Sequence, residues 1–98
     1  MNEKRSVSLA TLELTLPGIK SLKEKRSILR PLILQLRREF NVSASEVARM
    51  DDWDAAVICA VTVSNDGRVN QQVLAKLVNF ISSHFPDVEV MTFSIESR

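Results

Sequence analysis

Hydrophobic positions repeat with two different periods along the chain, and these periods predict which segments are strands and which are helices. Apolar residues alternate with polar ones from Arg5 to Leu16, as in a half-buried β-strand. Within this segment the apolar positions shift from odd to even numbers, as a β-bulge or a strand that is apolar on both faces would produce. Pro17 and Gly18 then end the predicted strand.

The next segment, Leu22 to Phe40, has helical spacing. At 100° per residue one face collects Leu22, Leu29, Ile33, Leu36 and Phe40. Ser21 followed by Glu24 has the form of a capping box, so we expect the helix to begin at Leu22. Pro31 removes one backbone hydrogen bond inside this helix and predicts a kink. Because the apolar spacing continues past Pro31, we expect one bent helix, and a break into two helices is the alternative.

The second half of the chain contains four further predicted features. They are a polar edge strand over Val42–Val47, a strand apolar on both faces over Trp53–Ser64, a helix marked by Val69 to Ile81, and a last strand over Val88–Ile95. Asp66 is a plausible N-cap of the second helix, and Pro86 must follow that helix.

The predicted order is strand, helix, strand, strand, helix, strand, which is the split βαβ pattern. We therefore expect a ferredoxin-like α+β sandwich over residues 1–98, as a single domain. Its antiparallel four-stranded sheet carries both helices on one face. The other face is left open, and an open apolar face favours homo-oligomerisation or a protein partner. The residues assigned to this possible interface are Trp53, Ala56, Ile58 and Ala60. The alternative is that a loop or a terminal segment covers the face.

Composition agrees with a soluble globular protein. Of the 98 residues 45% are hydrophobic and 26% are charged. The longest apolar run, Ala55–Val61, is far shorter than the roughly 18 residues of a membrane span, so no membrane association is expected. The N-terminal residues lack the pattern of a signal peptide, which favours a cytoplasmic protein.

Charge is distributed unevenly, although the net charge is only +1. Residues 17–49 contain eight basic and three acidic residues, whereas residues 50–98 contain three basic and seven acidic ones. On an ideal helix Lys23, Arg26, Arg30 and Arg37 form one stripe, Lys20 and Arg38 extend it, and Leu34 lies in its middle. Such a face is often only solvated. A cationic face with an apolar centre also suits a phosphate backbone or an acidic protein surface.

Stacking of RNA bases on the sheet is disfavoured by the aromatic residues. The chain has no tyrosine, and only Trp53 and Phe93 fall on predicted strands. A stacking platform on a sheet needs rings on the central strands. If RNA binds, we therefore expect recognition of its shape or backbone.

The residue types of this sequence give little support for a catalytic site or a metal site. With one cysteine and one histidine, a zinc site of Cys and His ligands cannot be assembled within one chain. Ser82 and Ser83 point to other helix faces than His84, so we assign no catalytic residue and no cofactor. Asp51, Asp52 and Asp54 are better explained as a solvated turn than as a metal site. The helix start beside Lys20 and Lys23 leaves hydrolysis of a small anion as a distant alternative.

Four stretches carry a likeness to a known family. They are LPGIKSLKEKR (16–26), RREFNVSASEV (37–47), Trp53 and VSND (63–66). With this spacing the chain resembles the YlxP-like family, small bacterial proteins of unknown function, over nearly its whole length. The resemblance implies a ferredoxin-like fold and supplies no established activity. Genes of the family often lie near translation and ribosome-maturation genes, which implies ribosomal RNA or a ribosome-associated protein as a partner.

Overall fold

The computed structural model describes residues 4–98, so the first three residues of the N-terminal segment lie outside the described part. The elements follow the predicted order of strand, helix, strand, strand, helix, strand. They are β1 (Ser6–Thr15), α1 (Leu22–Glu39), β2 (Ser43–Ala48), β3 (Ala55–Ser64), α2 (Gly67–His84) and β4 (Glu89–Ser97).

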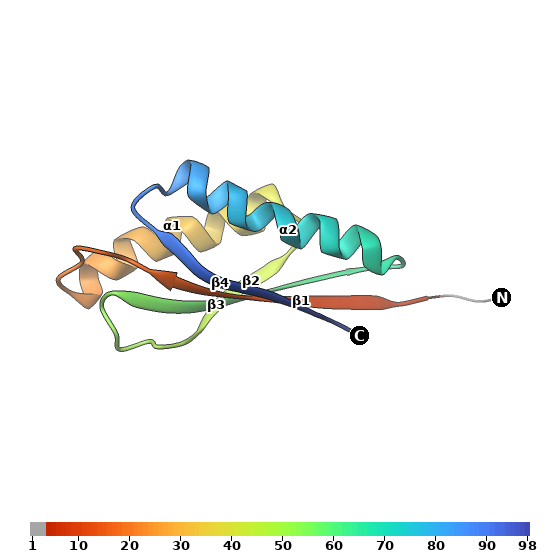
Figure 1. The fold of residues 1–98 in the computed structure, drawn as a ribbon, viewed down its shortest axis with the longest axis horizontal. Coiled ribbons are helices and arrows are strands. Elements are labelled where there is room, and N and C mark those ends of the chain that lie inside the picture. The colour runs from red at the N-terminus through yellow and green to blue at the C-terminus, as the bar shows by residue number, and fades with distance from the viewer. Residues whose placement is uncertain (1–3) are drawn as a thin grey trace.

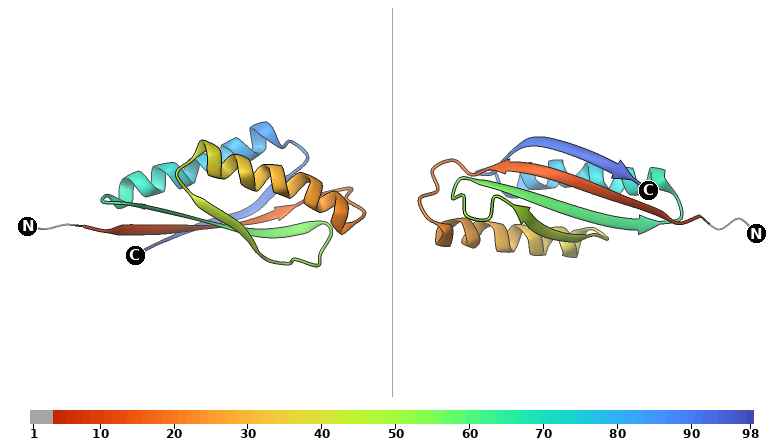
Figure 2. Two further views of the ribbon diagram at one scale, coloured as in Figure 1. Left: turned by 180° about the vertical axis from the view of Figure 1, so that it is seen from behind. Right: turned by 90° about the horizontal axis from the view of Figure 1, so that it is seen from below.

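The four strands form one antiparallel sheet in the order β2-β3-β1-β4. Both helices lie on the same face of this sheet, and the other face is not covered by a helix (Figures 1 and 2). α2 packs against β1, β3 and β4, whereas α1 lies toward β2. This arrangement confirms the predicted ferredoxin-like α+β fold.

Strand register decides which side chains enter the core. Leu12 of β1 pairs with Ile58 on one side and Phe93 on the other, and all three point toward the helices. Even-numbered residues of β1 are buried from Ser8 to Leu14, so β1 itself has no change of phase. Val7 and Leu9 simply lie on the open face, because the strand is apolar on both sides. The register shift occurs in β4, where Met91 is the extra residue.

The interface predicted on β3 was assigned to the wrong phase of the strand. Ala56, Ile58 and Ala60 are 1%, 0% and 0% exposed and belong to the core beneath the helices. The open face is instead formed by the alternate residues of β3, which are Val57, Cys59, Val61 and Val63. Alanine has a small side chain, so Ala56 and Ala60 allow the helices to pack closely against the sheet. Close packing favours the strand orientation in which these alanines face the helices.

α1 is one continuous helix across Pro31, so the alternative of two separate helices is wrong. Figure 2 shows it as a single rod without a sharp break. Ser21 Oγ accepts a hydrogen bond from the Glu24 N–H at 3.1 Å, and the Glu24 carboxylate accepts one from the Lys20 N–H at 2.7 Å. The first bond confirms the predicted N-cap at Ser21, whereas the Glu24 carboxylate reaches the N–H of Lys20, one residue before the partner expected for a capping box. Of the helices in residues 4–98, neither is long and apolar enough to cross a membrane.

Lys25 is buried, although the basic segment around it is exposed. Its side chain is 2% exposed and points inward from α1. The ammonium Nζ donates to the carbonyl oxygens of Arg49 and Asp52 at 2.8 and 2.7 Å, and it lies 2.8 Å from the Glu46 carboxylate. Lys25 therefore fastens the loop between β2 and β3 to the first helix. Arg49 in this loop has a positive φ of 59°.

Candidate nucleic-acid interface

The predicted basic residues of α1 lie on the outside of the molecule. Exposed cationic side chains are Lys20, Lys23, Arg26, Arg30, Arg37 and Arg38. Within residues 4–98 none of these six cations forms an ion pair. Their charge is therefore available to a ligand rather than neutralised by a neighbouring carboxylate. We call this surface, together with Leu34, the basic face.

Arg37 differs from the other cations of the basic face because the protein itself holds its guanidinium group. Nε and Nη2 of Arg37 donate to the carbonyl oxygen of Ala44 at 3.0 and 2.6 Å. Ala44 belongs to β2, so this contact ties the end of α1 to the edge of the sheet. Arg37 keeps its charge, but its orientation is fixed by β2.

Leu34 and a shallow hollow give the basic face its shape. Leu34 is 51% exposed, so an apolar side chain does stand among the cations as predicted. A hollow of about 490 Å³ lies one turn closer to the helix start. Its lining residues are Lys23, Arg26, Ser27, Arg30 and Pro31. Three cationic side chains in the lining of one hollow provide a favourable potential for an oxyanion such as a phosphate group.

The beginning of α1 is less suited to a small anion. The Glu24 carboxylate accepts from the Lys20 N–H and so brings negative charge to the helix start. This intramolecular cap occupies backbone donors that a free anion would need. The geometry therefore adds no support to the hydrolase alternative.

The residues considered for catalysis and metal binding do not form a centre. In the described part of the chain, no three His, Cys, Asp or Glu side chains gather closely enough to hold a metal ion. His84 Nδ1 donates to the carbonyl oxygen of Phe80 at 3.0 Å, and its ring stacks on Phe80 with a centroid separation of 4.1 Å. The His84 side chain is thus used at the end of its own helix.

Trp53 lies apart from the three core residues of β3 with which it was grouped. It stands in the loop before β3, is 52% exposed, and lines a hollow of about 310 Å³. The other lining residues are Ile19, Asp51, Asp52 and Asp54. Its exposure fits an anchor for a partner, whereas its predicted neighbours are inaccessible.

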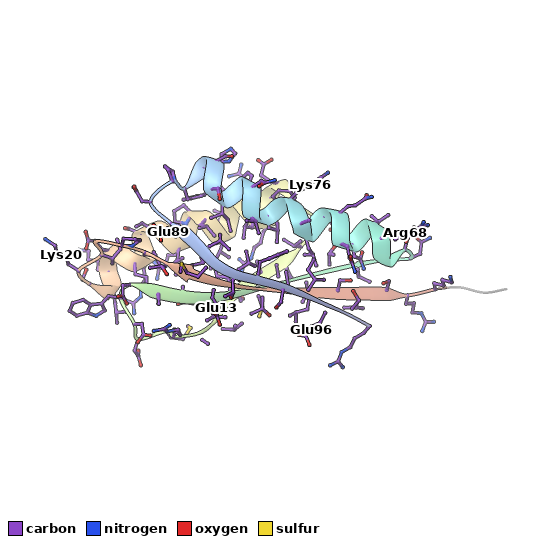
Figure 3. All side chains as sticks on the ribbon, viewed as in Figure 1. Glu13, Lys20, Arg68, Lys76, Glu89 and Glu96 are labelled. Carbon is purple, nitrogen blue, oxygen red and sulfur yellow. The ribbon has the colours of Figure 1, made fainter. Side chains whose placement is uncertain are left out.

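A second basic cluster lies at the start of α2 and was not predicted. Lys4, Arg5 and Arg68 line a hollow of about 690 Å³ there, together with Asp66. Asp66 caps α2 by accepting from the Arg68 N–H at 2.9 Å, and it also contacts the Arg68 guanidinium. These hydrogen bonds lower the pKa of the Asp66 carboxyl below its usual value, the backbone bond being the larger cause. Figure 3 shows Arg68 and Lys20 at opposite ends of the molecule.

Arg49 forms a third, smaller charge cluster in the loop between β2 and β3. Its Nε donates to the Asp52 carboxylate at 2.6 Å. This hydrogen bond, followed by the charge of the same carboxylate, raises the pKa of Arg49. The ion pair closes the loop on itself next to the Lys25 contacts, so we assign it a structural role.

Sequence reasoning missed the burial of Lys25 and the anchoring of Arg37, although a signal existed for the first. Lys25 precedes Leu29, Leu32 and Leu36 by four, seven and eleven positions, which is the spacing of the core face. Its place among leucines was sufficient to predict an inward direction. The bond from Arg37 to Ala44 depends on tertiary contact and has no local signal.

Comparison with known proteins gives the family and agrees with the fold. The family model described as "Protein of unknown function (DUF503)" matches residues 7–95. "Uncharacterized protein YlxP" of Bacillus subtilis (strain 168) is 31% identical over 83 residues, which cover 85% of this chain and 89% of that protein. The de novo designed protein Foldit4 is similar in structure, with a TM-score of 0.52 at 11% identity and 97% of both chains covered.

A further solved structure with a similar arrangement is protein SO0527 from Shewanella oneidensis. It has a TM-score of 0.49 at 21% identity, and 99% of this chain and 91% of that chain are covered. The likeness to Foldit4 concerns the fold alone. Because the family model spans nearly the whole chain and the YlxP relative covers most of both sequences, this chain belongs to the YlxP-like DUF503 family of proteins of unknown function.

Proposed function

We propose that the protein is a non-enzymatic RNA-binding protein that contacts ribosomal RNA through the basic face of α1. The observation that carries the proposal is the hollow formed by Lys23, Arg26 and Arg30, whose cations have no ion-pair partner within residues 4–98. Phosphate groups of an RNA backbone are ligands of opposite charge to these side chains. The position of family genes near translation genes favours ribosomal RNA over other polyanions.

Binding through phosphates depends steeply on salt. Each phosphate contact releases counterions, so the logarithm of the affinity falls with the logarithm of the salt concentration in proportion to the number of contacts. Replacing a cation that contacts a phosphate reduces this slope by about one. The slope therefore counts the cations of the basic face that take part.

The test uses two charge-reversal variants that change the net charge equally. Arg26→Glu with Arg30→Glu alters the hollow, whereas Lys76→Glu with Arg98→Glu alters exposed cations elsewhere. Binding of ribosomal RNA is measured by filter retention at a series of salt concentrations. We expect the first variant to lose affinity at least about tenfold and to flatten the salt slope by about two. The second variant should retain most of the affinity. Equal losses in both variants, or an affinity indifferent to salt, would refute the proposal.

A second candidate function is association of identical chains through the open face. Val7 and Val63 pair across β1 and β3 and are 40% and 58% exposed. The neighbouring pair, Leu9 and Val61, continues the same apolar surface. Four adjacent apolar side chains on two central strands favour a partner that buries them. In this case the basic face would serve solubility only.

A further inference from the structure

Next to the hollow lined by Lys23, Arg26 and Arg30 lies another one, called here the second hollow, whose lining has a different chemical character. It has a volume of about 210 Å³ and lies between α1 and the segment that follows α2. From α1 it is lined by Ser27, Ile28 and Pro31, and from the other side by residues 84–88. Ser27 and Pro31 also line the basic hollow, so the two spaces are neighbours across one turn of helix. Figure 2 shows the two helices side by side above the sheet.

One side of this second hollow ends in an exposed aromatic ring. The His84 ring stacks on Phe80 at an interplanar angle of 19°, and Phe80 meets Phe40 edge to face at 5.4 Å. The hydrogen bond from His84 Nδ1 to the Phe80 carbonyl fixes the orientation of the imidazole. A fixed ring with one occupied face offers its other face to a further planar group at little entropic cost.

The polar groups of the second hollow are mainly acceptors. Pro31 has no N–H, so the Ser27 carbonyl lacks the donor that a helix normally supplies four residues later. The Ser27 hydroxyl already donates to the Glu24 carbonyl at 2.6 Å. Asp87 adds a carboxylate to the lining. The Asp87 carboxylate repels a phosphate group, whereas acceptors beside a ring suit a planar base that carries an amino group.

The two hollows together match the two parts of a nucleotide. We propose that they bind one unpaired nucleotide of an RNA strand, with its phosphate against Lys23, Arg26 and Arg30 and its base stacked on His84. The inference rests on the proposed function and adds that the basic face selects single-stranded RNA with an amino-bearing base. A duplex keeps its bases stacked inside and can reach only the cationic hollow.

The experiment compares a fluorescent adenylate RNA strand with an RNA duplex of the same length, using fluorescence anisotropy at one salt concentration. His84→Ala removes the ring, His84→Phe keeps one, and Asn79→Ala changes another exposed residue of α2. Circular dichroism checks that each variant is folded.

We expect His84→Ala to weaken binding of the adenylate strand by about 5- to 150-fold, which corresponds to the loss of one stacked base. Duplex binding should stay unchanged, His84→Phe should recover most of the affinity, and Asn79→Ala should behave as wild type. The nucleotide hollow is ruled out if His84→Ala leaves strand binding intact, or weakens strand and duplex equally.

The same experiment separates this inference from the proposed function. If Arg26→Glu with Arg30→Glu abolishes strand binding while His84→Ala has no effect, the cationic contact stands and only the base hollow is wrong. If wild type binds neither the strand nor the duplex, both proposals fail.

Discussion

The ammonium group of Lys25 connects α1, strand β2 and the loop between β2 and β3. It is the one charged side chain of residues 4–98 that is almost fully buried, and it meets two carbonyl oxygens and the Glu46 carboxylate. Taking a charge out of water is costly, and here three oxygen neighbours offset that cost. Removing any one of these groups would therefore leave a buried polar group unpaired and would loosen the loop between β2 and β3.

Replacing Lys25 by methionine should destabilise the protein strongly. The variant keeps the length of the side chain but leaves the Glu46 carboxylate and two carbonyl oxygens without their donor. We expect the free energy of unfolding to fall by about 3 kcal/mol, as when one partner of a buried ion pair is removed. Urea unfolding followed by circular dichroism measures the change.

The matched control for this prediction is Lys23→Met, two positions earlier on the exposed side of α1. It should change the free energy of unfolding by less than about 0.5 kcal/mol. The double variant Lys25→Met with Glu46→Leu should recover part of the lost stability, because no unpaired charge remains. A Lys25→Met protein as stable as the Lys23→Met control would show that the buried contact contributes nothing.

Caps at the two helices show how far local signals reach. Ser21 and Glu24, and likewise Asp66, were identified from residue type and position, and each makes the expected bond to a backbone N–H. Capping is predictable because donor and acceptor are only two or three residues apart. The phase of β3 was not predictable in this way, since both of its faces are apolar and only the position of the helices distinguishes them.

The Asp66 cap makes the stability of α2 depend on pH. The folded protein lowers the Asp66 pKa below the ordinary value of 3.8, so the charged carboxylate contributes stability above that pH and loses it as the pH falls further. Asp66→Asn retains an acceptor for the Arg68 N–H but carries no charge. Wild type should therefore be the more stable protein near neutral pH, and the difference should shrink as the pH falls below 3.8.

Thermal unfolding of wild type and Asp66→Asn at several pH values tests the Asp66 prediction. The two proteins differ only at residue 66, so the difference in Tm between them isolates that residue. Asp87→Asn, a change of a carboxyl group in the segment after α2 that caps no helix, is the matched control. A wild-type advantage that persists unchanged to low pH would contradict a stabilising carboxylate at the cap.

Taken as a whole, the molecule has one covered and one uncovered sheet face, and association through the open face can be measured directly. If the open face carries the second candidate function, sedimentation equilibrium at high protein concentration gives a mass above that of a single chain. Val63→Lys places a charge among the apolar side chains of the open face and should shift the protein to monomers. Val69→Lys, at a valine of α2 that is 46% exposed, is the matched control and should leave the mass unchanged. A wild-type protein that stays monomeric at the highest concentration rules out this association.

The complete architecture was predictable because its signals are periodic and local. Alternation in β1, helical spacing in α1 and α2, and the breakers Pro17, Gly18 and Pro86 locate every element to within a few residues. The basic face followed from the same helical projection. The hollow beside His84 could not be predicted, since it depends on the tertiary approach of residues 84–88 to α1. Which side chains become neighbours across elements is decided by packing rather than by spacing.

Backbone pairing at the beginning of β1 determines where a tag can be attached for these experiments. Val7 and Arg98 exchange two backbone hydrogen bonds of 3.0 and 2.7 Å, so Arg98 lies beside the beginning of β1. Lys20 lies at the far end of the molecule (Figure 3). A purification tag or a sensor-chip linkage fused after Arg98 would therefore leave the hollow on α1 clear. The same fusion would crowd the valines on the open face, so masses should be determined on untagged protein.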